Sequence, residues 1–351
     1  MLYKMNIEKF LLRDNNNLDF IRIVCASMVI ISHSYVINPC GHEDFLRRLT
    51  GFTYSGELAV KLFFFISGIL VTDSLIRKQS IKGFLISRIF RMMPGLIFVL
   101  LITAFIVGPL TSNLNVVNYF RNSATYSYVV KNMFFVSTYN LPGVFAKNAS
   151  SIVNGSLWSL RYEARCYFVL LAIFIICKYT IKRYALVYSI IIALIFIDAL
   201  FKLNLLTKDT NSGGYNLLPM SFALGSLLAV YKKYIVIDYK VLLLFILLTV
   251  IFWRTGFNEI LFVTTVCLSV IVAAENKYIR MIKIKHDISY GVYLWGFLVS
   301  QTIFYVMGNQ NIYLFMLYSL FISYIMGFLS FIIVERKFML YGKNINKGLN
   351  A

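Results

Sequence analysis

The sequence predicts an all-α fold, a polytopic membrane helix bundle with about ten transmembrane helices and both termini in the cytoplasm. Hydrophobic residues make up 59% of the 351 residues and charged residues only 14%, a composition that soluble domains do not have. The apolar residues form long runs, whereas a membrane barrel has short alternating segments. The formal charge of +19 comes from basic residues clustered between these runs, a pattern typical of topology signals rather than of a nucleic-acid-binding patch.

A spanning helix needs about 20 apolar residues, and ten runs approach or exceed that length. We expect helices over residues 18–37, 57–76, 84–110, 156–177, 184–201, 216–231, 239–253, 257–274, 288–308 and 311–334. Of the 34 Lys and Arg residues, 20 fall at the termini and in the connections on their side, 8 in the opposite connections and 6 within helices. The positive-inside rule then places both termini in the cytoplasm.

We expect one domain over residues 1–351, with its membrane core at 18–338. The longest outer connection, 111–155, is extracytoplasmic in this topology and contains a half-apolar stretch. That stretch either lies along the membrane interface or packs on the helix bundle. The three His and five Cys residues lack ligand-type spacing, so we expect no metal site.

The first predicted helix carries two ionisable residues, Arg22 and His33. Eleven positions on a helix correspond to about three turns, roughly 16 Å along the axis and about 20° around it. Both side chains therefore face the same way. Ionisable residues inside a membrane are costly, and a functional site is their default interpretation. Burial of the histidine between helices is the alternative.

The third predicted helix opens with a pair of arginines, Arg88 and Arg91. Their i, i+3 spacing puts both on one face at the cytoplasmic end. Guanidinium groups suit phosphates and carboxylates because they stay charged and bond bidentately. Arg22 lies at about the same depth, which favours convergence of three cations on one anion. The alternative is that the arginines only anchor the helix at the interface.

The fourth predicted helix places Glu163 about 10 Å inward from its outer end, at a depth similar to that of His33. A carboxylate beside an imidazole would hold its tautomer and stabilise the protonated form. An internal ion pair of Glu163 with Arg161 or Arg165 is an equally open interpretation.

Four further residues are candidate supporting groups. Ser67, Trp158 and Tyr167 lie in the second and fourth predicted helices. Glu335 lies at the inner end of the last predicted helix and is included with them.

Six motifs in order resemble the acyltransferase-3 family of integral membrane O-acyltransferases across most of the chain. They are Arg22-x10-His33, GELAVKLFFFISGILVTDS (56–74), Arg88-x-x-Arg91 with Pro94, NGSLWSLRYEARCYF (154–168), SYGVYLWGF (289–297) and the closing Val334-Glu335-Arg336-Lys337. The sequence departs from the family at two positions. Lys61 stands where an acidic residue is common, and Gly296 stands where the family often has His.

The resemblance implies an enzyme of the bacterial cytoplasmic (inner) membrane that takes an acyl group, usually acetyl from cytoplasmic acetyl-CoA. The acceptor would be a carbohydrate or glycolipid at the outer side, such as lipopolysaccharide O-antigen. In that scheme Arg22, Arg88 and Arg91 hold the donor phosphates, and His33 is the catalytic base or acyl relay. Glu163 would orient or balance the imidazolium. Acyl transfer also needs a group that stabilises the oxyanion, and Ser67, Trp158 and Tyr167 are the candidates for it.

The main alternative function is a transporter or flippase for an anionic or glycolipid substrate, which would also place charges inside a bundle. Such transporters usually show paired halves with interrupted helices, and no internal repeat is visible here. A polysaccharide polymerase or ligase would not need the Arg22–His33 register or the inner arginine pair.

Overall fold

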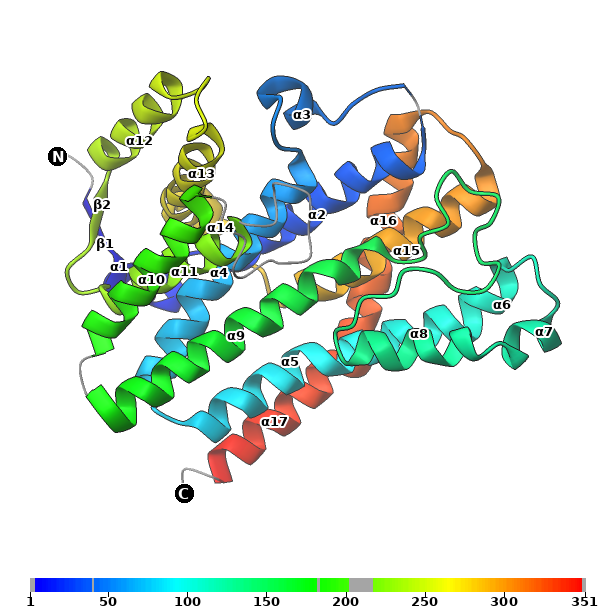
Figure 1. Ribbon diagram of the computed structural model, residues 1–351, viewed down its shortest axis with the longest axis horizontal. Helices are drawn as coiled ribbons and strands as arrows, with labels where there is room; N and C mark the ends of the chain where they lie inside the picture. Colours follow the sequence, from blue (N-terminus) through cyan, green and yellow to red (C-terminus); the bar gives the residue numbers. More distant parts are fainter. Residues whose placement is uncertain (1–3, 40, 182–183, 202–216, 349–351) are drawn as a thin grey trace.

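The computed structural model describes residues 4–39, 41–181, 184–201 and 217–348, and helices make up most of it (Figure 1). The longer helices are α2 (Leu18–Ile37), α4 (Ser55–Lys78), α5 (Ile81–Ile102), α8 (Ser123–Met133), α9 (Trp158–Ile176), α10 (Tyr184–Phe201), α11 (Leu217–Val230), α12 (Tyr239–Ile251), α13 (Asn258–Glu275), α15 (Ser289–Met307), α16 (Ile312–Ser330) and α17 (Arg336–Gly348). The short ones are α1 (Ile7–Phe10), α3 (Phe45–Thr50), α6 (Gly108–Thr111), α7 (Val116–Arg121) and α14 (Lys277–Met281). Strand β1 (Lys4–Asn6) pairs antiparallel with β2 (Val236–Asp238), with Met5 opposite Ile237.

Among the described residues, six helical segments are long and apolar enough to cross a membrane. They are Leu18–Ile37, Ser55–Lys78, Ile81–Thr111, Asn258–Glu275, Ser289–Met307 and Ile312–Gly348. The prediction of a helical, multi-pass membrane protein is therefore confirmed. The other four expected spans also lie on helices, but α9 carries Arg161, Glu163 and Arg165, and the apolar segments of α10, α11 and α12 are shorter.

Side-chain caps fix the ends of the helices that later form the site. The Asn17 side chain accepts a hydrogen bond from the Phe20 amide (3.1 Å) and begins α2. Ser80 does the same for α5 through the Gly83 amide (3.0 Å). Gln79, with φ of 52°, ends α4 just before Ser80. Each cap satisfies amides or carbonyls that the helix itself leaves unpaired.

The backbones of α4 and α11 touch at two glycines. A Cβ on Gly68 would lie 2.1 Å from the Phe222 carbonyl oxygen, and a Cβ on Gly225 would lie 2.2 Å from the Phe65 carbonyl oxygen. Only glycine fits at such distances, and small residues at helix contacts are typical of membrane bundles. We call this contact the α4–α11 seam.

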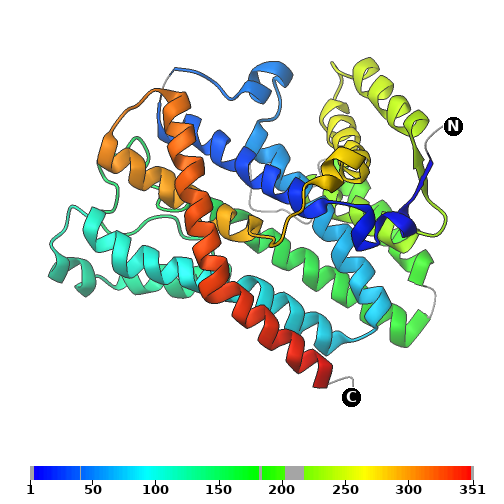
Figure 2. The same cartoon turned by 180° about the vertical axis from the view of Figure 1, so that it is seen from behind.

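The last spanning helix continues beyond its apolar stretch. A π-helical turn, Phe331–Glu335, joins α16 to α17, and Figure 2 shows the two as one long rod that ends at the C-terminus. The expected span ended at residue 334 because the sequence turns polar there. The helix nevertheless runs to Gly348 and lies beside α5.

The expected outer connection, 111–155, contains α7 and α8 and packs on the helix bundle. The Tyr119 hydroxyl donates a hydrogen bond to the Ala104 carbonyl oxygen (2.8 Å). Tyr128 and Phe145 are buried, whereas Phe134 remains exposed. The half-apolar stretch thus packs in part against α5 and presents the rest outward.

Candidate active site

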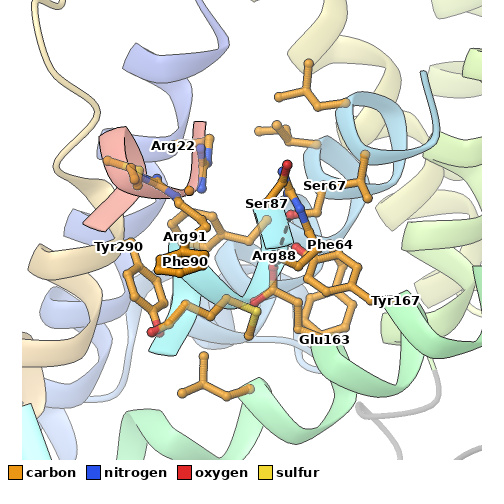
Figure 3. Close-up of a pocket in the computed structure, with 18 of the residues that line it drawn as sticks. Arg22, Phe64, Ser67, Ser87, Arg88, Phe90, Arg91, Glu163, Tyr167 and Tyr290 are labelled. Atoms are coloured by element: carbon orange, nitrogen blue, oxygen red, sulfur yellow. Dashed lines mark hydrogen bonds between the residues drawn. The ribbon is translucent and has the colours of Figure 1, made fainter. Parts of the chain in front are cut away.

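A cavity of about 560 Å³ lies between α2, α4, α5, α9, α15 and α17. Its lining includes five of the sequence-predicted site residues in addition to Arg22: Ser67, Arg88, Arg91, Glu163 and Tyr167. These residues belong to α2, α4, α5 and α9, and Figure 3 shows their side chains converging. The structure thus brings the three predicted cations into one cavity, although Arg22 and Arg91 are 69 positions apart in the sequence.

Two of the three arginines share one carboxylate. Arg22 Nη1 and Arg91 Nη2 each lie 2.5 Å from Asp287 Oδ2. Asp287 precedes α15, and its other oxygen accepts hydrogen bonds from the Ser289 hydroxyl (2.5 Å) and amide (3.1 Å). The carboxylate is therefore fixed at one end by the start of α15 and pairs with α2 and α5 at the other.

Charge explains the protonation state of Asp287. Burial alone would raise the pKa of this carboxyl, but the guanidinium groups of Arg22 and Arg91, together with the Ser289 hydrogen bonds, lower the pKa to about 2. An ionised carboxylate between two cations leaves one positive charge in excess. We call Arg22, Asp287 and Arg91 the arginine cluster.

Arg88 differs from the other two arginines because no carboxylate lies within 4.0 Å of it in the part of the chain that the structure describes. Its guanidinium carbon lies 5.7 Å from the centre of the Tyr167 ring. Arg91 lies similarly over Tyr290, at 5.9 Å. Arg88 therefore adds a cation without a direct ion pair to the described cavity, which suits an anion.

Glu163 belongs to the same cavity. It accepts hydrogen bonds from Ser67 Oγ (3.4 Å) and from the Tyr167 hydroxyl, and Figure 3 shows Arg88 close to this group. Arg161 and Arg165 lie on the same helix, and an internal ion pair of Glu163 with either of them stays a prediction.

His33 does not line this cavity. Its ring packs edge-on against Phe297, with 4.8 Å between ring centres, and its Nδ1 is buried without a hydrogen-bond partner among the described residues. The hydrogen bonds of Glu163 go to Ser67 and Tyr167, and the expected Glu163–His33 pairing stays a prediction. The imidazole lies farther along α2, on the side where Phe297 approaches Gly155.

Two further candidates lie outside the cavity lining. Trp158 contacts the Tyr162 ring at 6.0 Å between centres. Glu335 is buried between α5, α15 and α16, where its Oε1 accepts a hydrogen bond from Ser330 Oγ (3.0 Å). Neither residue lines the cavity.

Lys61, one of the departures from the family pattern, is fully buried between two carboxylates. Its Nζ lies 2.9 Å from Glu57 Oε1 and 2.7 Å from Glu259 Oε1. Thr53 donates a further hydrogen bond to Glu57 (3.2 Å). Lys61 thus ties α4 to α13, and none of these residues lines the arginine cavity. We call Glu57, Lys61 and Glu259 the lysine cluster.

The sequence interpretation missed Asp287. This residue lies in a connection between helices, and nothing in its neighbours distinguishes it from an ordinary loop carboxylate. The one local signal is Asp287-x-Ser289 before an apolar run, which marks a helix start but does not identify the two arginines as partners.

Comparisons with known proteins identify the family of the chain. Residues 15–335 match the family model described as "Acyltransferase domain". The chain is 26% identical over 331 residues to an "O-acetyl transferase" of Shigella phage Sf6, covering 93% of this chain and 96% of that protein. It is 30% identical over 168 residues to "Nodulation protein 10" of Rhizobium leguminosarum bv. viciae, covering 44% and 43% of the two chains. No solved structure matches the chain. Because the family match covers nearly the whole sequence, the chain belongs to the acyltransferase-3 family and is an acyltransferase enzyme.

Proposed function

We propose that this enzyme is a membrane O-acyltransferase that moves an acetyl group from cytoplasmic acetyl-CoA to a hydroxyl of a cell-surface or lipid-linked sugar. Lipopolysaccharide O-antigen is the acceptor that we test first. The name "O-acetyl transferase" of the phage relative supports the acyl group and the acceptor atom. The proposed setting is the bacterial inner membrane, with ten spans and both termini cytoplasmic.

The observation that carries the proposal is the excess positive charge of the cavity. Arg22 and Arg91 share one carboxylate, and Arg88 has none. A coenzyme A donor carries several phosphate charges, and guanidinium groups bind phosphate oxygens bidentately. A neutral substrate would gain nothing from this arrangement, so the cavity supports an anionic donor.

In the proposed reaction, neutral His33 removes the proton from the sugar hydroxyl as its oxygen attacks the acetyl carbonyl carbon. A new C–O ester bond forms, the C–S thioester bond breaks, and the departing sulfur takes a proton to give free CoA. The imidazole lies about 16 Å from Arg22 along α2, a gap that an extended pantetheine arm can bridge. Nδ1 of His33 has no partner in the described residues, which leaves the ring free to bond to substrate.

Glu163 takes a supporting role in this scheme. It bonds to Ser67 and Tyr167 and so holds two hydroxyl groups at the wall of the donor cavity. Each hydroxyl donates its single proton to Glu163, so either would serve as an oxyanion donor only after turning away from Glu163.

The test is mass spectrometry of surface glycans from a host strain with the gene deleted, then complemented with wild type, His33→Ala or His42→Ala. His42 is exposed in an outer connection and serves as the matched control. Loss of an acetyl-sized mass from one sugar, restored by wild type and His42→Ala only, is the expected result. General base catalysis typically contributes about 10²–10⁴-fold, so His33→Ala should restore no detectable acetylation.

Full rescue by His33→Ala would remove the histidine from the mechanism. If deletion changes no glycan mass, the acceptor or the reaction is different, and transport of an anionic substrate becomes the function to examine.

A further inference from the structure

Helix α17 lies beyond the residues that the family model matches, yet it forms part of the cavity wall. The family match ends at residue 335, and α17 begins at Arg336. Met339, Gly342, Lys343, Asn346 and Lys347 of this helix all line the cavity. The family's common sequence features therefore do not account for this wall.

The register between α17 and α5 is fixed by contacts at successive levels. Arg91 Nη1 lies 3.4 Å from Met339 Sδ, and Gly342 lies against the Phe90 ring, which leaves no room for a Cβ. Asn346 Nδ2 donates hydrogen bonds to Ser87 Oγ (3.1 Å) and, one turn lower, to the Gly83 carbonyl oxygen (3.3 Å). The two helices are thus antiparallel, and α17 descends from the level of Arg91 toward the start of α5.

This register orders the cations along the cavity. Lys343 and Lys347 follow Met339 by one and two helical turns, about 6 and 12 Å closer to the end of α17. Lys78, at the end of α4, lines the same cavity. We call Lys78, Lys343 and Lys347 the lysine mouth. Arg22 and Arg91 lie deeper, at the level of Met339. Arg88, about one turn below Arg91, lies at about the level of Lys343.

The lysine mouth carries no balancing carboxylate. All three lysines are exposed, and in the described parts of the chain none has a carboxylate within 4.0 Å. The neighbouring cations Arg77 and Lys232, by contrast, both pair with Asp73, at 3.7 and 2.6 Å. The acidic residue nearest to the inner end of α4 is therefore already occupied by other partners.

We propose that the lysine mouth is the subsite for a phosphomonoester dianion, which in a coenzyme A donor is the 3′-phosphate of the adenosine. This inference rests on the proposed acyl-CoA donor. It assigns different phosphate groups of that donor to the arginines and to the lysines. Arginine forks suit the diphosphate held deep in the cavity, whereas lysine ammonium groups, flexible point charges with three donors, suit a terminal phosphate near solvent. Residues of α17 then determine how the enzyme distinguishes phosphorylated from dephosphorylated donor.

The experiment measures binding of CoA and of 3′-dephospho-CoA to the purified full-length protein in nanodiscs of zwitterionic phosphatidylcholine. Wild type, the double variant Lys343→Gln/Lys347→Gln and the control Lys337→Gln are compared. Lys337 is exposed on α17 but does not line the cavity. Zwitterionic lipid removes anionic headgroups as competing phosphates.

We expect wild type and Lys337→Gln to bind CoA about tenfold more tightly than 3′-dephospho-CoA, a difference of about 1.4 kcal/mol. The double variant should lose this preference: its affinity for CoA falls about tenfold, while that for 3′-dephospho-CoA is unchanged. Its thermal unfolding should match wild type because the lysines are exposed and unpaired.

Two results would overturn the inference. If the double variant weakens both ligands equally, or neither, α17 does not recognise the terminal phosphate, and its lysines interact with the membrane surface instead. If wild type binds neither ligand, the proposed donor itself is wrong, an outcome distinct from the failure of the lysine mouth alone.

Discussion

The arginine cluster and the lysine cluster have the same arrangement with opposite charge, because each has one central charge between two charges of the other sign. In the first, Asp287 lies between two cations, Arg22 and Arg91, and in the second, Lys61 lies between two carboxylates. Both tie together helices that are distant in sequence. They differ in access: the two arginines line the cavity, whereas Lys61 has no exposed surface and its cluster lies elsewhere.

The difference shows which intramembrane charges can take part in binding. Guanidinium groups that face a cavity can turn toward an incoming phosphate while Asp287 keeps them in place. A fully buried lysine enclosed by two carboxylates does not reach the cavity, and breaking a buried pair is strongly unfavourable. A charge inside the membrane is therefore a functional candidate only when the structure also gives it access.

The largest expected effect is on the lysine cluster. Lys61→Met leaves Glu57 and Glu259 without their cation, and we expect the free energy of unfolding to fall by about 3–5 kcal/mol. Denaturant or SDS titration of the detergent-solubilised protein measures this. The triple variant Glu57→Gln/Lys61→Met/Glu259→Gln is the matched control and should recover most of the stability, since no buried charge remains unpaired. Unchanged stability of Lys61→Met would contradict the contrast between the clusters.

An intermediate effect is expected at Arg88, and on donor binding rather than stability. Hydrogen bonds to charged groups contribute about 1.5–3 kcal/mol, so Arg88→Gln should weaken acetyl-CoA binding about 10- to 150-fold. Because Arg88 has no ion pair in the described residues, the midpoint of thermal unfolding should stay close to wild type. Calorimetric titration gives the affinity, and an unchanged dissociation constant would exclude Arg88 from the anion site.

The smallest effect concerns pH. The pKa of Asp287 is about 2 in the folded protein and about 3.9 in an unfolded chain. Its stabilising contribution is therefore complete above about pH 4 and is lost as the pH falls toward 2. We expect the difference in thermal stability between wild type and Asp287→Asn to be constant from pH 5 to 8 and to shrink at pH 3. A difference that disappears already at pH 6 would show that the arginines do not lower this pKa.

Apolar patterning predicted the helices well. The first span was expected at residues 18–37 and is found there, and the spans expected at 257–274 and 288–308 lie within one residue of α13 and α15 at each end. The apolar pattern did not predict the end of the last helix, which continues beyond its apolar span. After residue 334 the side chains become polar, yet α17 continues because Gly342 allows close packing on Phe90 and Asn346 bonds to α5.

The candidate site was predictable only in part. Arginine spacing and depth along the helices predicted one cavity for Arg22, Arg88 and Arg91, because helical geometry fixes both quantities. Depth alone also predicted that Glu163 meets His33, and this pairing stays a prediction because depth along two helices does not fix the distance between them. Asp287 and Lys343 could not be found this way, since their partners are set by tertiary packing between segments far apart in the chain.

The α4–α11 seam has a consequence for how freely the cavity can change shape. The Phe65 and Phe222 carbonyl oxygens occupy the space that a Cβ on Gly225 or Gly68 would need, so the two helices can move only as one rigid body. Ser67 lies on α4 and moves with this pair of helices. The opposite wall of the cavity, α17, is held against α5 through side-chain contacts. In a saturation-mutagenesis library we expect Gly68 and Gly225 to tolerate no larger residue, although neither lines the cavity. Exposed positions along α17 should accept many.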